Sequence, residues 1–461
     1  MILELILATA LLGGDPEPVD WRTAATETIE TLKRLVRFKT VNPPGSEFPL
    51  VSWVKEELAK DGIEAEAIQP AEGRGNLIAR IRGDGSKRPF LIVAHVDVVG
   101  IEEGKWTVDP FEAVEKDGFI WGRGAVDDKG MAACAIEVLR LLARNKVKLK
   151  RDVILALTCD EESGGQYGVK WLIENRREQI DAEFGLNEGG KIIQRNGRPL
   201  YLGVQNAEKR PHNLRLVARG ISGHGSVPRP DNPILALARA LNRIGTNPAP
   251  VMLNETTRKF FSGMAEVEDE PYGSFLKALS SGADPALAAH AAAAISERDY
   301  TFASMMRNSI SPTILKGGIR TNVIPSEVEV NLNCRLLPGE KVEDFARWLT
   351  EVIQEPAVEV VYEIPEEPEA PSSPIDSDLF RAIEAVAEEM APGAPVVPYM
   401  STGGTDSARL RRAGIPTYGL VPMPLTLDDL SRMHGNDERL QTDSVRFGIE
   451  FLYHLVLKVA G

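Results

Sequence analysis

The chain has 461 residues, of which 43% are apolar and 26% charged, a composition typical of globular proteins large enough for more than one domain. Its formal net charge of −14 leaves no excess of basic groups to replace the counterions of a nucleic acid, which excludes general nucleic-acid binding. The three cysteines, Cys134, Cys159 and Cys334, are far apart and odd in number. This pattern predicts buried free thiols and neither a disulfide framework nor a cysteine-type zinc site.

Residues 1–20 are predicted to be a signal peptide or another N-terminal extension. Residues 2–12 are apolar except for Glu4 and Thr9, and the Ala-Thr-Ala at 8–10 resembles a cleavage site. The stretch is too short to cross a bilayer as a helix, so no stable membrane span is expected in the mature protein. Its length favours export to the periplasm or beyond the cell. Glu4 and the lack of a basic start favour the alternative, an extra apolar helix on a cytoplasmic protein.

The next part of the chain alternates between strand and helix patterns. Helices are predicted at about 21–38, where apolar residues recur at helical spacing, and at 49–61. Strands are predicted at 63–68, 76–81, 89–93 and 153–158, with a helix at 131–145. This alternation predicts an α/β fold with a central mixed, mostly parallel sheet flanked by helices. Residues 21–209 would form its first part.

A smaller α/β domain is predicted at residues 210–370, inserted into the larger one. Its expected elements are strands at 212–218, 320–323, 328–336 and 358–362, helices at 232–244 and 342–353, and a helical insertion at about 246–312. Residues 365–374 are rich in Pro and Glu and are predicted to be a linker. Residues 371–461 then resume the alternation and complete the larger domain.

His95 and Asp97 are the first residues that point to chemistry. They follow the apolar run 90–94 and are two positions apart, so on an extended chain both side chains point the same way. Open α/β sheets bind ligands at the carboxyl ends of their strands. A His-x-Asp pair alone is equally compatible with a buried pair that binds nothing.

Acidic residues gather at comparable places further along. Asp127 and Asp128 stand between glycines ahead of a helix, where they could simply cap it. Asp160-Glu161-Glu162 follows the apolar run 153–158, where three acids repel one another unless a cation or protons compensate. Glu188 follows another candidate strand. Two histidines, His95 and the remote His434, together with several carboxylates suit divalent ions such as Zn²⁺, Co²⁺ or Mn²⁺.

Six motifs, in this order, are highly specific as a set. They are Ala94-His95-Val96-Asp97, Gly122-Arg123-Gly124-x-x-Asp127-Asp128-Lys129-Gly130, Asp160-Glu161-Glu162-x-Gly164-Gly165, Gly223-His224-Gly225-Ser226, Gly403-Gly404-Thr405-Asp406 and His434. From about Thr23 onward the chain resembles the metallohydrolase family of aminoacylase, glutamate carboxypeptidase, carboxypeptidase S and succinyl-diaminopimelate desuccinylase. The resemblance implies a zinc-exopeptidase-like catalytic domain, formed by 21–209 and 371–461, and a lid/dimerisation domain at 210–370.

The resemblance also implies a role for each residue of the site. Two divalent ions, zinc first and Co or Mn as alternatives, would be bridged by Asp127. One ion would also be held by His95 and Glu188, the other by Glu162 and His434. Glu161 would take a proton from the attacking water and pass it to the leaving amine, and Asp97 would orient His95. The peptide between Asp127 and Asp128 is expected to be cis.

In the lid, the resemblance implies a role for His224 as stabiliser of the oxyanion in the partner subunit of a homodimer. Asn322 and Arg335 would hold the substrate carboxylate, to which the fork of an arginine is matched. The backbone of Gly403, Gly404 and Thr405 would shape the substrate pocket. The long 246–312 insertion resembles the enlarged carboxypeptidase S branch.

The implied function is metal-dependent hydrolysis of amide bonds in small peptides or N-acyl amino acids with a free carboxylate. An enzyme of carboxypeptidase type and one of aminoacylase type fit equally. A non-catalytic metal-bound scaffold is one alternative, but it predicts loss of the general base, and Glu161 is present. A two-metal phosphoesterase is the other, and it fits less well with a lid arginine suited to carboxylates.

Overall fold

The structure is a computed structural model that describes residues 19–461, so nearly all of the predicted N-terminal extension lies outside the described residues. Between residues 19 and 461 no helix combines the length and the apolar character that a membrane crossing requires. Contacts divide the chain into two units. Unit 1 comprises the chain up to Leu202 with Asp376–Ala394 and Ile415–Gly461, and unit 2 comprises Gly203–Ile375 and Pro395–Gly414.

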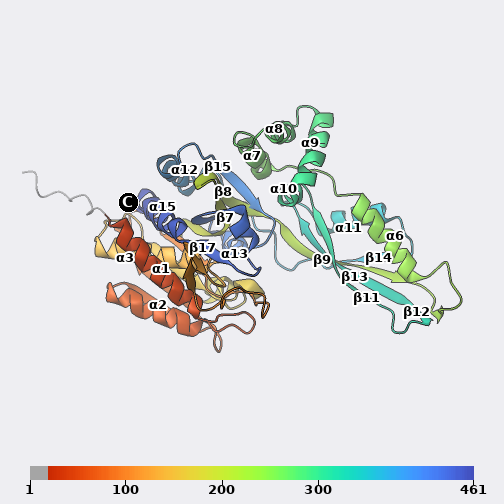
Figure 1. Ribbon diagram of the computed structural model, residues 1–461, viewed down its shortest axis with the longest axis horizontal. Coiled ribbons are helices and arrows are strands. Elements are labelled where there is room, and N and C mark those ends of the chain that lie inside the picture. The colour runs from red at the N-terminus through yellow and green to blue at the C-terminus, as the bar shows by residue number, and fades with distance from the viewer. Residues whose placement is uncertain (1–18) are drawn as a thin grey trace, which may run out of the picture. The chain divides into compact units, whose positions relative to one another are not determined.

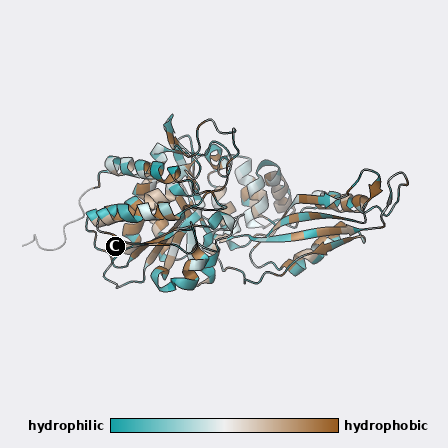
Figure 2. Ribbon diagram, turned by 90° about the horizontal axis from the view of Figure 1, so that it is seen from below, coloured by the Kyte–Doolittle hydropathy of each residue, from teal (hydrophilic) through white to brown (hydrophobic). Residues whose placement is uncertain are grey.

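The strands of unit 1 follow the order β1-β2-β6-β3-β7-β16, and next comes β8, which begins in unit 1 and ends in unit 2. These strands are β1 (Glu64–Ile68), β2 (Asn76–Ile81), β6 (Val153–Thr158), β3 (Phe90–His95), β7 (Phe184–Arg195), β16 (Thr417–Leu425) and β8 (Arg198–Glu208). β3 runs parallel to both β6 and β7, and β16 runs parallel to β7, whereas β1 and β2 are antiparallel. The predicted mixed, mostly parallel α/β sheet is thereby confirmed. Figure 2 shows its strands rich in apolar residues, and β3 and β6 are buried throughout.

Helices cover this sheet. They are α1 (Trp21–Arg37), α2 (Phe48–Lys60), α3 (Lys129–Arg144), α4 (Val169–Asn175), α5 (Arg177–Ile180), α12 (Asp378–Met390), α14 (Leu427–Ser431) and α15 (Thr442–Ala460). α1, α3 and α15 pack against one another, as Figure 1 shows. Leu32, Leu35 and Val36 of α1 are fully buried because the helical repeat places them on one face. A small sheet, β17-β5-β4 (Arg439–Gln441, Phe119–Trp121 and Val114–Lys116), lies in the same unit.

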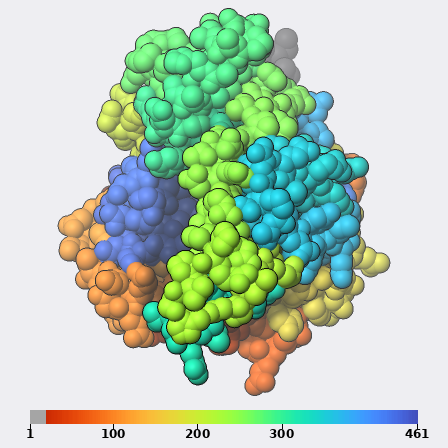
Figure 3. Space-filling view, turned by 90° about the vertical axis from the view of Figure 1, so that its right-hand side faces the viewer, coloured from red at the N-terminus to blue at the C-terminus, as the bar shows by residue number. Residues whose placement is uncertain are grey.

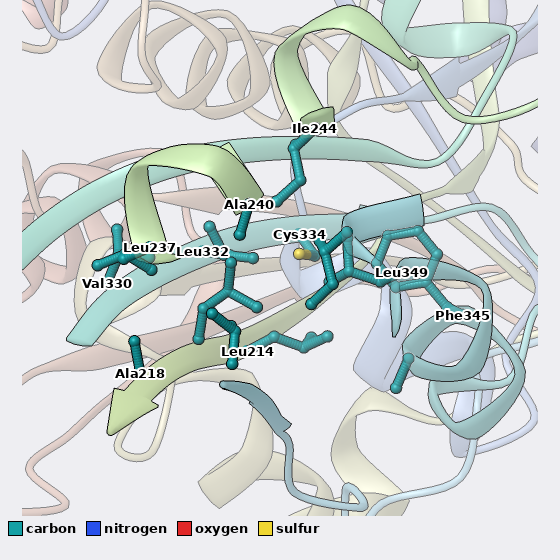
Figure 4. Packing of buried hydrophobic residues seen from close by; sticks show 14 of the residues in the cluster. Leu214, Ala218, Leu237, Ala240, Ile244, Val330, Leu332, Cys334, Phe345 and Leu349 are labelled. Carbon is teal, nitrogen blue, oxygen red and sulfur yellow. The ribbon is translucent and has the colours of Figure 1, made fainter. Parts of the chain in front are cut away.

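Unit 2 contains an antiparallel sheet with the order β11-β13-β9-β14. These strands are β11 (Ser309–Gly317), β13 (Glu327–Leu336), β9 (Arg210–Arg219) and β14 (Val358–Val361). Every second residue of β13 is buried, since one face of the sheet packs against α6 (Pro233–Thr246) and α11 (Val342–Ile353). Leu214, Leu332 and Leu349 lie in this core, shown in Figure 4.

The predicted helical insertion consists of α7 (Glu255–Met264), α8 (Tyr272–Ser281), α9 (Pro285–Arg298) and α10 (Tyr300–Met305). Figure 3 shows it in green at the surface. Within unit 2, α7 packs on β15 (Val396–Ser401), the strand that neighbours β8 and precedes α13 (Asp406–Arg412). The helices end at Met305, because residues 309–312 already belong to β11.

Two strand predictions need correction. Glu188 was expected at a strand end, but β7 continues through it to Arg195 because β7 and β8 pair with each other. The strand predicted at 320–323 is reduced to β12 (Val323–Ile324), which pairs with β10 (Gly223–His224), since Gly318, with φ 75°, turns the chain after β11. The three cysteines are free and buried, as predicted.

Candidate active site

The candidate residues of unit 1 lie where strands of the sheet end. His95 is the last residue of β3 and is in register with Thr158, the last residue of the parallel strand β6. Glu161 and Glu162 form the short turn (Glu161–Ser163) that follows β6. Because the carboxyl ends of parallel strands share one edge of the sheet, the fold brings these side chains together there.

Asp127 is the centre of the arrangement. His95 Nε2 lies 2.9 Å from Asp127 Oδ1, and His434 Nε2 lies 2.9 Å from Oδ2. The ring of His434 also approaches the carboxylate of Glu162, with 3.2 Å between Nε2 and Oε1. Residues separated by more than 300 positions therefore meet at one carboxylate. The peptide between Asp127 and Asp128 is cis, as expected.

This group of side chains has the composition of a cation site. Ligand atoms of His95, Asp127 and Glu162 all lie within 4.8 Å of one another. The hydrogen bond to Asp127 and the nearby carboxylate of Glu162 raise the pKa of His434 to about 10. Burial acts to lower the pKa of His95, but the neighbouring carboxylates of Asp127 and Asp97 together outweigh burial and raise the pKa well above its usual value. Nitrogen and oxygen donors packed this closely, with Glu162 Oε1 buried and lacking a well-directed hydrogen bond, fit a divalent metal ion.

Asp97 orients His95 through its backbone carbonyl and not through its carboxylate. His95 Nδ1 lies 3.0 Å from the main-chain oxygen of Asp97 and 3.6 Å from its carboxylate, so the backbone carbonyl orients the ring. The carboxylate instead accepts hydrogen bonds from the backbone amides of Glu161 and Glu162, at 3.2 and 3.1 Å. Asp97 therefore holds in place the turn that carries the candidate general base.

Comparison with known proteins identifies the family. The model of peptidase family M20/M25/M40 matches residues 91–458. The chain belongs to this family. Its relatives include the N-fatty-acyl-amino acid synthase/hydrolase PM20D1 of Xenopus tropicalis, 29% identical over 93% of this chain and 85% of that protein. The probable carboxypeptidase S-like 2 of Dictyostelium discoideum is 30% identical over 81% and 72%, and aminoacylase-1A of Rattus norvegicus is 24% identical over 94% and 95%.

Solved structures show the same fold. The M20 metallo-carboxypeptidase Sso-CP2 from Sulfolobus solfataricus aligns with a TM-score of 0.68 at 20% identity, covering 94% of this chain and 99% of that one. The Bacillus subtilis YXEP protein, described as a dinuclear metal-binding peptidase, aligns with a TM-score of 0.60 at 15% identity, over 95% and 98%. The M20 enzyme is thus an amidohydrolase of the metallopeptidase and aminoacylase class, as the sequence predicted.

A buried polar network of the M20 enzyme was not predicted from the sequence. Asn42 Nδ2 donates to the carboxylates of Asp97, at 2.8 Å, and of Asp160, at 3.2 Å. Arg74 fixes this amide by donating to Asn42 Oδ1 at 2.9 Å, and it also pairs with Asp160 and with the fully buried Glu47. The network therefore holds the 160–162 turn in place through its hydrogen bonds to Asp97 and Asp160. Asp97 and Asp160 belong to motifs, whereas Asn42, Arg74 and Glu47 do not.

Glu188 lies in β7, which pairs with β3 in the register Ile92 to Leu186. This pairing places Glu188 near the carboxyl end of β3, where His95 stands. Its carboxylate is not a member of the group formed by His95, Asp127 and Glu162.

The remaining candidates belong to unit 2. His224 is exposed in β10, and its Nδ1 lies 2.7 Å from the hydroxyl of Ser226. Asn322 is exposed in the turn before β12, whereas Arg335 is partly buried in β13 and its Nε donates to Asn333 at 3.2 Å. Burial lowers the pKa of Arg335.

Residues Gly403 and Gly404 lead into α13, and Thr405 caps this helix by accepting from the amide of Ser407. The Thr405 hydroxyl donates to the buried carboxylate of Glu208 at 3.0 Å, and Arg411 approaches the same carboxylate at 3.3 Å. Glu208, which the sequence did not single out, therefore anchors this loop within unit 2.

Proposed function

We propose that this M20 enzyme hydrolyses N-acyl amino acids at a site for two divalent metal ions, zinc being the first candidate. The convergence of His95, His434 and Glu162 on Asp127 carries the proposal. Relatives named as N-fatty-acyl-amino acid and aminoacylase enzymes favour an N-acyl amino acid substrate. A peptide with a free C-terminal carboxylate is the second candidate, favoured by the carboxypeptidase S-like relative.

The proposed ligands are His95, Asp127, Glu162, Glu188 and His434, with Asp127 shared between the ions. When bound, the ions would polarise the scissile carbonyl and lower the pKa of water toward about 7. Nitrogen from imidazole and oxygen from carboxylates are the donors that zinc accepts in catalytic sites, and cobalt and manganese accept them too.

The proton transfers are assigned to Glu161. Its backbone amide donates to Asp97, which holds Glu161 in the turn next to Glu162 at the end of β6. We assign to it the acceptance of a proton from the attacking water and its delivery to the leaving amine nitrogen, a transfer typically contributing about 10²–10⁴-fold to the rate. Arg335 and Asn322 are proposed to bind the substrate carboxylate, and the backbone of Gly403 to Thr405 to line its pocket.

A homodimer through unit 2 is part of the proposal. β11 is an edge strand of its sheet, and its outer residues Ile314 and Leu315 are exposed, as is Ile319 just after it at 86%. A sheet edge with apolar side chains favours pairing with a second chain. In such a dimer His224 is proposed to stabilise the oxyanion in the partner's site.

The test combines metal content with hydrolysis. The purified protein is stripped with chelator, reloaded with Zn²⁺, Co²⁺ or Mn²⁺, and assayed on short- and long-chain N-acyl amino acids, dipeptides and p-nitrophenyl phosphate. Wild type should regain hydrolysis with about two ions per chain, as a two-metal site requires. Glu161→Ala should bind the same metal and lose hydrolysis, whereas Glu174→Ala, on the exposed side of α4, should keep both.

Several outcomes would contradict the proposal. A chain that binds no metal would refute the ligand assignment. Two bound ions with no hydrolysis of any substrate would leave a non-catalytic metal scaffold. Hydrolysis of the phosphate ester alone would favour a phosphoesterase, and a preference for dipeptides over N-acyl amino acids would select the second substrate class.

A further inference from the structure

Glu438 is the centre of a second buried cluster in unit 1. Its side chain is fully buried, four positions after His434. One carboxylate oxygen, Oε2, accepts from Arg123 Nη1 at 2.7 Å and from the amide of Gly124 at 3.0 Å. The other, Oε1, accepts from the amides of Val126 at 2.8 Å and Asp127 at 3.1 Å. Four donors thus meet one carboxylate, and one of them belongs to the residue proposed to bridge the ions.

The same two segments are joined at further points. Arg123 Nη2 donates to the main-chain oxygen of Gly435 at 2.6 Å, and its guanidinium lies 5.2 Å from the ring centroid of Trp106. The amide of Gly122 donates to the main-chain oxygen of Glu438 at 2.9 Å. These hydrogen bonds hold residues 122–127 and 434–438 at a fixed separation, although the two segments are far apart in sequence.

His434 depends on this attachment. Its side chain is 54% exposed, whereas that of His95 is 2% exposed, so packing does little to place it. Its backbone has φ 59°, a left-handed conformation that a non-glycine residue keeps only when its surroundings enforce it. Neighbouring contacts add to that enforcement, because Asn436 donates to Glu102 and Asp437 accepts from Thr107.

We infer that Glu438 is a positioning residue that sets the distance between Asp127 and His434, and so determines binding of the ion that these two residues share. The inference rests on the proposed two-metal function. An uncharged isostere cannot replace the carboxylate. Whichever way the amide of a glutamine is turned, its NH₂ group faces either Arg123 and Gly124 or Val126 and Asp127, all of which are donors. Buried donors are then left without an acceptor, and the loop moves.

The test is a zinc titration of the chelator-stripped protein in competition with a chromogenic chelator. Wild type should bind about two ions per chain. Glu438→Gln should keep one ion at wild-type affinity and bind the other about 10–100-fold more weakly, the range expected when a ligand loses its support. The matched control is Glu137→Gln. Glu137 is also fully buried beside an arginine, 3.1 Å from Arg140, but it lies within α3 and contacts none of the proposed ligands.

Glu137→Gln should change only the melting temperature and leave both affinities at wild-type values. Wild-type affinities for both ions in a folded Glu438→Gln variant would overturn the inference while the proposed function stands. Failure of wild type to bind two ions would refute the proposed function, and the inference with it. If Glu438→Gln does not fold, the same zinc titration is made on Arg123→Lys. It keeps the positive charge but loses the fork that reaches both Glu438 and Gly435, so weaker binding of one ion is expected and unchanged affinities refute the inference.

Discussion

Substitution of Arg74 by methionine should destabilise unit 1 strongly. The guanidinium is 6% exposed and lies 3.2 Å from Glu47 and 3.0 Å from Asp160, and it also donates to Asn42 and to the main-chain oxygen of Pro44. Methionine fills a similar volume but leaves two buried carboxylates without their cation.

The magnitude follows from this burial. Removing one partner of a buried ion pair costs about 3–5 kcal/mol, because the remaining charge is left uncompensated. At about 2–4 °C per kcal/mol for a domain of this size, the melting temperature should fall by about 6–20 °C. Arg82→Met is the matched control. Arg82 is 66% exposed and pairs with Glu64 at 3.4 Å, so its loss should cost less than about 1 kcal/mol.

The pH dependence of this loss has a definite sign. Burial raises the pKa of Glu47 from 4.5 to about 7, although Arg74 acts in the opposite direction. The folded protein therefore holds more protons than the unfolded chain between these pH values, and the free energy of unfolding falls as the pH rises through them. Without Arg74 the pKa of Glu47 rises further, so Arg74→Met should be less stable relative to wild type at pH 8 than at pH 5.

Thermal and urea unfolding at the two pH values would check both statements. Circular dichroism follows the whole chain, and tryptophan fluorescence gives an independent probe. Suppose that Arg74→Met lowers the free energy of unfolding no more than Arg82→Met does, or equally at pH 5 and pH 8. Either result would show that the substitution leaves no buried carboxylate without a compensating charge. The argument from burial would then be wrong.

Three other substitutions test separate parts of the molecule. Glu208→Gln should raise KM more than it lowers kcat, because the anchor of Thr405 is weakened; steady-state kinetics with an unchanged KM would contradict this role. Leu315→Glu should give a monomer by size exclusion with light scattering, whereas Leu287→Glu, on exposed α9, should not; a persistent dimer in the first variant would exclude β11 as the interface. Phe260→Ala should cost about 3–5 kcal/mol in urea unfolding, since this ring is fully buried; a loss below about 1 kcal/mol would show that the helical insertion repacks.

The sequence predicts the regular elements well where one periodicity dominates. The helix expected at 342–353 is α11, because Val342, Phe345 and Leu349 recur on one buried face. The strand end expected at Glu188 is wrong because pairing with β8 extends β7, and pairing between segments is not visible in local composition. The short β12 is a similar case, since Gly318 turns the chain before it.

For the site, the motifs single out the residues that the fold brings together around Asp127. They do not show the side chains that hold these residues. Glu438 follows a histidine in a polar loop and looks like a solvated acid, yet it is fully buried. Arg74 and Asn42 likewise come from segments without any strong pattern. Whether a charged side chain is buried depends on partners far away in sequence, and the local sequence does not identify these partners.

The position of β16 determines when the candidate site is completed during synthesis. β7 and β8 are made one after the other, but β16, made about 200 residues later, occupies the place between them in the strand order. His434 follows β16 by nine residues. The earlier strands of unit 1 are therefore made while the candidate metal-binding group around Asp127 still lacks His434, and the group is complete only after β16 has been made. His434 lies 27 residues before Gly461, so this group is completed only when almost all of the sequence has been synthesised.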